Sequence, residues 1–188
     1  MTIITKEKTK DTAISSAFLK GDTKEHILKF FGEENIISSS VKDLKIKFEV
    51  DTTPPKGAKY EAKYKLLPSP HEVNLYDESS LFAGKIHAVL CRNWNLRTKG
   101  RDLYDYIFFL SKKTSVNMEL LKSKLVSSKV LKQSDAFDIN HLKQMLYKKF
   151  DTINYKDAKA DVMPFIKDKK SLDVWSKEFF VEITKSLQ

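Results

Sequence analysis

The chain is 188 residues long, which is enough to bury a sizeable core in one domain or in one domain with a helical appendage. Hydrophobic residues make up 41% of it and charged residues 31%, which excludes a disordered chain, and no run approaches the roughly 18 apolar residues of a membrane helix. The formal net charge of +9 favours polyanionic partners such as nucleic acids or nucleotides, although a lysine-rich surface that merely keeps the protein hydrated would look the same.

Alternating apolar and polar residues predict strands in the first part of the chain. We expect strands over residues 10–20, over LKIKFEVD at 44–51 and over YEAKYKL at 60–66. A short helix is expected to begin near Asp22, and the connection PSPHEVNLYD from 68 to 77 is irregular with room for one more short strand. The single cysteine, Cys91, excludes an internal disulfide and fits a cytoplasmic protein.

Beyond Asp77 the apolar spacing becomes helical and stays so to the end of the chain. The predicted helices span residues 79–93, 102–112, 117–128, 138–150, 157–167 and 171–187. Strands followed by helices indicate an α+β protein, with a sheet region over 1–77 and a helical region over 78–188.

All three arginines of the chain lie close together, at Arg92, Arg97 and Arg101, although the chain has 34 basic residues. The planar guanidinium group holds phosphate or carboxylate in a bidentate way that lysine cannot match. We therefore expect the chemistry of this protein to lie near residues 85–105.

The helix predicted over 79–93 carries Leu81, Phe82, Ile86, Val89 and Leu90 as its apolar stripe. A second stripe along one edge holds the two cations Lys85 and Arg92, with the small residues Gly84 and Ala88 beside them. Two interpretations are open. Either the small side chains leave space for a ligand or another part of the protein to approach the helix closely, or this edge is the border of a buried helix, from which the long side chains of Lys85 and Arg92 extend to solvent.

The helix RDLYDYIFFL is apolar over most of its circumference and should therefore be buried. Asp102 and Asp105 share one face of it, and buried carboxylates need partners, for which Arg101, Lys99 and the Lys85/Arg92 edge are candidates. Either the two aspartates form a helix cap and a buried ion pair, or one of them positions a lysine or a substrate hydroxyl.

Two acids, Glu49 and Asp51, lie on one face of the strand over 44–51. Paired carboxylates at a strand edge can complete a divalent-metal site, but charges that alternate along a solvent-exposed face give the same pattern.

Taken in order, several segments resemble the AbiEii family, the nucleotidyltransferase-fold toxins of bacterial type IV toxin–antitoxin and abortive-infection systems that act in phage defence. The matching segments are AFLKGDTKEHILKFF (17–31), IKFEVDTTPP (46–55), LFAGKIHAVLCR (81–92), KGRDLYDYIFFL (99–110) and DAKADVMPFIKDKKSLDVWSKEFF (157–180). The resemblance implies a partial nucleotidyltransferase sheet followed by a C-terminal helical bundle that completes the active-site cleft.

The resemblance also implies roles for individual residues. Lys85 would be the catalytic-site lysine that contacts nucleotide phosphates, and Asp102 would be the active-site aspartate. Either Glu49 or Asp51 would be the third carboxylate, borne on a strand. The residues that support the site or bind phosphate would be Arg92, Lys99, Arg101 and Asp105. The implied reaction is Mg²⁺-assisted transfer of a nucleotide from a nucleoside triphosphate to an acceptor such as tRNA, and the implied protein partner is an antitoxin.

The family's opening Gly-Gly/Ser motif and its metal-binding Asp-x-Asp pair have no match in the sequence. We therefore expect this chain alone to be an incomplete, inactive nucleotidyltransferase, or else a non-catalytic module that binds nucleic acid or antitoxin. A sheet without its first strands exposes an edge and an apolar face, so a homodimer is also expected.

Overall fold

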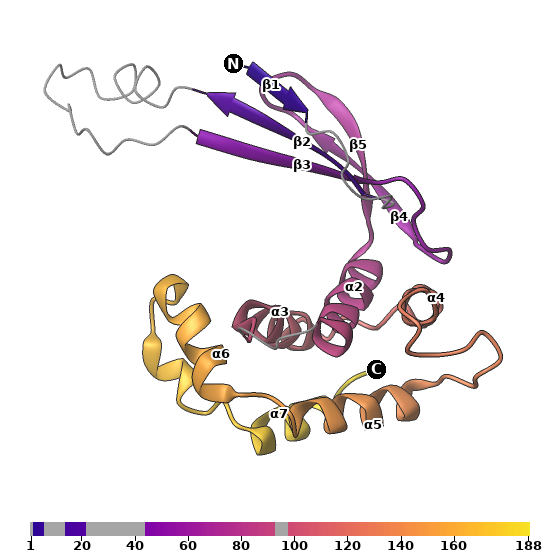
Figure 1. Ribbon diagram of the computed structural model, residues 1–188, viewed down its shortest axis with the longest axis vertical. Coiled ribbons are helices and arrows are strands. Elements are labelled where there is room, and N and C mark those ends of the chain that lie inside the picture. Colours follow the sequence, from indigo (N-terminus) through magenta and orange to yellow (C-terminus); the bar gives the residue numbers. More distant parts are fainter. Residues whose placement is uncertain (1, 6–13, 22–43, 93–97) are drawn as a thin grey trace, which may run out of the picture. The chain divides into compact units, whose positions relative to one another are not determined.

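The computed structural model describes residues 2–5, 14–21, 44–92 and 98–188, and it confirms the α+β class predicted from the sequence (Figure 1). The chain divides into two compact units, residues 1–54 and 55–188. Strand gives way to helix at Asp77, between the last strand and the first described helix.

The first unit contains an antiparallel sheet in the order β1-β2-β3. Its strands are β1 (Thr2–Thr5), β2 (Ile14–Gly21) and β3 (Leu44–Asp51). The bounds of β3 are those of the alternating segment LKIKFEVD, as predicted, and β2 falls within and just beyond the expected strand. The helix expected from Asp22 lies outside the described residues.

The second unit begins with a two-stranded antiparallel hairpin, β4 (Tyr60–Lys65) and β5 (His71–Tyr76). β5 is the additional short strand for which the sequence left room. At the base of the hairpin, the backbone N–H of Asp77 donates to the carbonyl of Lys59 over 3.0 Å. The rings of Tyr60 and Tyr76 stack there with centroids 5.0 Å apart, so the end of β5 is held where it enters the first helix.

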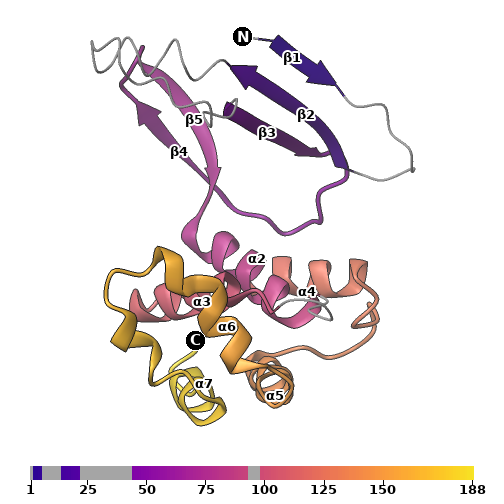
Figure 2. The same cartoon turned by 60° about the vertical axis from the view of Figure 1, so that its left-hand side comes forward.

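Helices make up the rest of the second unit and pack around one core (Figure 2). They are α2 (Glu78–Cys91), α3 (Gly100–Ser111), α4 (Met118–Ser127), α5 (Ile139–Phe150), α6 (Tyr155–Val162) and α7 (Lys177–Thr184), with 3₁₀ turns at Met163–Phe165 and Lys169–Leu172. The long helices predicted over 157–167 and 171–187 are each partly replaced by these 3₁₀ turns. Pro164 lies within the first turn, which begins where α6 ends.

A chain of aromatic ring contacts runs through the helical core. Phe82 of α2 stacks on Phe109 of α3 with centroids 5.2 Å apart. Tyr106 joins this pair to Phe150 of α5, which in turn contacts Phe180 of α7. The hydroxyl of Tyr106 is buried and makes a 2.7 Å hydrogen bond with that of Thr184, so this polar group is satisfied inside the core.

Two predictions about burial are wrong in detail. Leu81 was expected to face inward, yet its side chain is 41% exposed, and Ala83 is buried in the core instead. The helix α3 was expected to be buried almost all round, yet Tyr104 and Phe108 are about half exposed. Neighbouring helices cover only one side of α3, and the number of apolar residues in a helix does not reveal how many sides are covered.

Candidate functional site

Three ion pairs bridge α2 and α3 along the seam where the two helices pack. Their members on α2 are spaced seven residues apart, which is close to two helical turns and places them on one face. The pairs, from the beginning of α2 to its end, are Glu78–Lys112, Lys85–Asp105 and Arg92–Asp102. The last two pairs bring together four of the residues that the sequence singled out.

Arg92 and Asp102 form the most buried of these pairs. One guanidinium nitrogen of Arg92, Nη1, donates to both carboxylate oxygens of Asp102 over 2.8 Å. The Asp102 side chain is only 7% exposed. Burial raises the pKa of this carboxyl above its usual value, even though Arg92 acts in the opposite direction. The nearby charge of Asp105 also raises the pKa of Asp102, whereas that of Lys85 lowers it, as Arg92 does.

Lys85 and Asp105 form a second, more exposed pair. The ammonium group of Lys85 donates to Oδ2 of Asp105 over 2.7 Å, and both side chains are more than one-third exposed. Solvent screens such a pair, so its contribution to stability is small.

A cavity of about 260 Å³ opens beside the α2 edge that carries these cations. Gly84 and Ala88 form part of its wall, and beyond the backbone of α2 and the residues next to Gly84 in the chain no heavy atom lies within 4 Å of the position that a Cβ at Gly84 would take. Its lining residues are Tyr76, Ser80, Leu81, Gly84, Lys85, Ala88, Arg92, Asp102, Leu120 and Lys124. The edge of α2 that carries Gly84, Lys85, Ala88 and Arg92 thus borders a cavity.

Three further candidates from the sequence, Lys99, Arg101 and Arg97, lie elsewhere or make other contacts. Lys99 is the residue that precedes α3. Arg101 does not pair with Asp102 or Asp105. Its Nε instead lies 4.0 Å from Oδ2 of Asp161 on α6, whose side chain is almost fully buried. Arg97 lies outside the described residues.

The two strand-borne acids, Glu49 and Asp51, lie two residues apart on β3, in the first unit, and both are exposed. In the sheet register they lie opposite Ser16 and Ile14 of β2. The backbone N–H of Thr53 donates to Oδ1 of Asp51 over 3.0 Å, which closes a turn at the end of the strand.

The two aspartates beside the cavity, Asp102 and Asp105, already accept from cations and are not arranged as ligands of a divalent metal ion. Mg²⁺ requires oxygen ligands in near-octahedral geometry. Both oxygens of Asp102 accept from Arg92, and Oδ2 of Asp105 accepts from Lys85. Within the part of the chain that the structure describes, no three His, Cys, Asp or Glu side chains gather closely enough to hold a metal ion.

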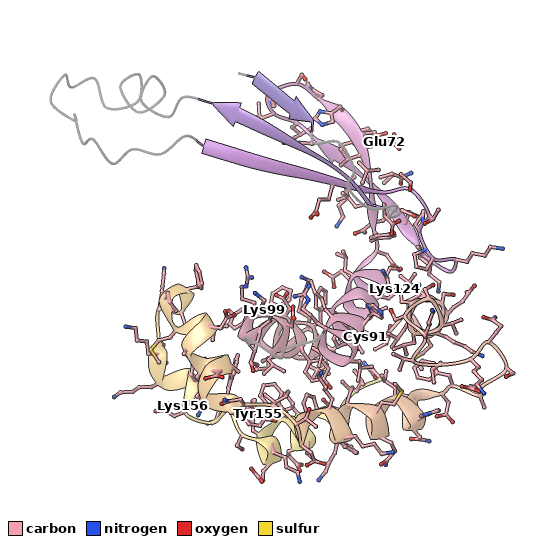
Figure 3. All side chains as sticks on the ribbon, in the orientation of Figure 1. Glu72, Cys91, Lys99, Lys124, Tyr155 and Lys156 are labelled. Carbon is pink, nitrogen blue, oxygen red and sulfur yellow. The ribbon has the colours of Figure 1, made fainter. Side chains whose placement is uncertain are left out.

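The structure adds Ser80 and Lys124 to the site, and sequence reasoning missed both. The hydroxyl of Ser80 accepts from the backbone N–H of Lys59 and from Nδ2 of Asn117, which fastens the base of the hairpin and the start of α4 to α2. Lys124 reaches the cavity from α4 (Figure 3). Nothing in its local sequence distinguishes it from the many other lysines of the chain.

The fold and the site together define an α+β protein whose helical part has a cavity bordered by cations. A model of the family described as nucleotidyl transferase AbiEii toxin, type IV TA system, matches residues 3–182, so the chain belongs to this family. Membership makes it a nucleotidyltransferase-type toxin, with a nucleotide as substrate and an antitoxin as partner. No curated protein and no solved structure matches the chain. None of the described helices has the length and apolar character needed to cross a membrane.

Proposed function

We propose that residues 55–188 provide the phosphate-binding side of a site that transfers a nucleotide from a nucleoside triphosphate to an acceptor such as tRNA. The observation that supports this most is the cavity beside α2, which Lys85 and Arg92 border and which the small residues Gly84 and Ala88 leave open. Cations fixed around an open space can hold phosphate oxygens and offset the charge that develops during phosphoryl chemistry.

In this proposal Lys85 and Asp102 are the catalytic residues. Lys85 exchanges its contact with Asp105 for a phosphate oxygen of the triphosphate. Asp102, whose raised pKa favours proton uptake, accepts a proton from the attacking hydroxyl, and Arg92 keeps the carboxylate oriented. Arg101 and Lys99 sit at the start of α3, where they can hold the polyanionic acceptor close to Asp102.

We also propose that the 188-residue chain does not complete the transfer by itself. Nucleotidyltransferases generally use divalent metal, but the aspartates near the cavity already pair with Lys85 and Arg92, and the sequence contains no Asp-x-Asp pair. Glu49 or Asp51 would supply the strand-borne carboxylate that is expected in this family. A separate polypeptide that carried the remaining ligands would restore the reaction.

The alternative is a non-catalytic module that binds nucleic acid or antitoxin. The net charge of +9 and the ion pairs that already occupy Lys85 and Arg92 favour it. A module that binds through phosphates should lose affinity for RNA steeply as salt rises, and Lys85→Ala and Arg92→Ala should weaken it equally for any RNA sequence.

The test incubates the chain with Mg²⁺, each labelled nucleoside triphosphate and total tRNA, alongside Lys85→Ala and Asp102→Ala variants. We expect calorimetry to detect nucleotide binding that Lys85→Ala weakens, with no label transferred to tRNA. Transfer that both variants abolish would show that the site is complete, and the proposed incompleteness would be wrong. Salt-sensitive RNA binding without any nucleotide binding would instead support the non-catalytic module.

A further inference from the structure

The cations around the cavity beside α2 are not equivalent. Lys85 and Arg92 each pair with an aspartate of α3, so their charges are largely balanced before any ligand arrives. Lys124 also lines the cavity, and among the described residues no carboxylate forms an ion pair with it. The cavity therefore carries a net positive charge that comes from Lys124.

The packing of α4 fixes the place from which Lys124 reaches the cavity. Its neighbours Leu120, Leu121 and Leu125 are buried in the core. The helix begins at Asn117, whose side chain accepts from the N–H of Leu120 and donates both to Ser80 of α2 and to the carbonyl of Gly57. Because α4 is anchored to α2 and to the base of the hairpin, Lys124 is held opposite the α2 cations.

Lys124 also lies close enough to His87 for its charge to act on this histidine. This histidine lies on α2, and its Nε2 is 2.7 Å from the hydroxyl of Ser128 at the end of α4. Burial lowers the pKa of His87, and the positive charges of Lys124 and Arg92 lower it further, whereas a hydrogen bond with the backbone of Lys124 acts in the opposite direction. Lys124 and Arg92, which both line the cavity, thus also place positive charge near His87.

We propose that Lys124 is the principal anion-binding residue of the cavity and that it holds the polyphosphate part of a nucleotide. The inference rests on the proposed function and deepens it, because it assigns the first phosphate contact to α4 and not to α2. The cavity volume of about 260 Å³ is below the roughly 300–1,000 Å³ of sites that enclose a drug-sized ligand. It accommodates phosphate groups better than an entire nucleoside triphosphate.

The test measures binding of inorganic pyrophosphate by calorimetry to the full chain, to Lys124→Met and to Lys122→Met. Methionine keeps most of the aliphatic length of lysine and removes only its charge. Lys122 lies on the same helix but does not line the cavity, so its variant is the matched control. We expect Lys124→Met to weaken binding about tenfold or more, as loss of a charge-assisted hydrogen bond does, and Lys122→Met to change it less than twofold.

A second readout follows the titration of His87 by NMR. In the full chain, pyrophosphate should raise the pKa of His87 because the bound anion offsets the nearby positive charges, and Lys124→Met should abolish this shift. Equal pyrophosphate affinity in the three proteins would overturn the role of Lys124 while leaving the cavity as a phosphate site. Absence of pyrophosphate binding in the unmodified chain would contradict both this inference and the proposed phosphate-binding function.

Discussion

Arg92 and Asp102 have unequal surroundings, and removing either should therefore have unequal effects. Asp102 is almost fully buried, whereas the side chain of Arg92 is about half exposed. Without Arg92, a buried carboxylate remains unpaired and must either stay charged at a cost or take up a proton. Without the charge of Asp102, Arg92 can turn to solvent.

We predict that Arg92→Met lowers the free energy of unfolding at pH 7 by about 1–3 kcal/mol and that Asp102→Asn lowers it less. The folded pKa of Asp102 lies above its unfolded value and rises further in Arg92→Met. The native state then binds the proton more tightly, so the deficit relative to the unmodified chain should shrink as pH falls from 7 through the folded pKa. Urea unfolding at several pH values measures this, and a deficit that did not change with pH would contradict the argument.

The packing of α3 on α6 depends on a residue without a side chain. A Cβ placed at Gly100, the first residue of α3, would lie 2.0 Å from the carbonyl oxygen of Ala158. That atom is backbone in the middle of α6 and cannot move without shifting the helix. Gly100 thus allows the start of α3, which carries Arg101 and Asp102, to approach α6 closely.

We predict that Gly100→Ala lowers the free energy of unfolding by about 1–3 kcal/mol through overpacking. Gly84→Ala is the matched control, because beyond the backbone of α2 and the residues next to it in the chain no heavy atom lies within 4 Å of its added carbon, and alanine favours the helix by up to about 1 kcal/mol. Thermal unfolding should therefore move in opposite directions for the two variants. Similar changes in both would show that the close approach at Gly100 does not limit the packing.

Residue patterns within short segments of the sequence predicted most of the strands and helices, but only part of the candidate site. The strict alternation of LKIKFEVD was enough to define β3, and helical spacing was enough to place Lys85 and Arg92 on one edge of α2. The spacing could not predict which aspartate pairs with Lys85 and which with Arg92, because the pairing depends on how α3 is rotated relative to α2. Lys124 lies 39 residues beyond Lys85 in the chain, and only the packing of α4 on α2 brings it to the cavity.

The second unit contains the whole described hydrophobic core, from Phe82 to Leu187, yet its hairpin contributes little to that core. Tyr64, Leu66 and Leu67 are each more than 65% exposed, and among the described strands β4 and β5 pair only with each other. Unpaired strand edges that carry apolar side chains favour association with another chain. A second copy of this chain is the simplest partner for such an edge.

We predict that the chain self-associates through this hairpin into a homodimer, which sedimentation velocity should detect as a species whose proportion rises with concentration. Tyr64→Lys places a charge at the exposed edge strand, so it should shift the equilibrium to monomer. Lys63→Arg is the control, since it changes a neighbouring residue of the same strand while keeping its charge near Glu61. If the unmodified chain sediments as a monomer at every concentration, the hairpin edge is not an interface between copies, and the antitoxin becomes the partner to test against it.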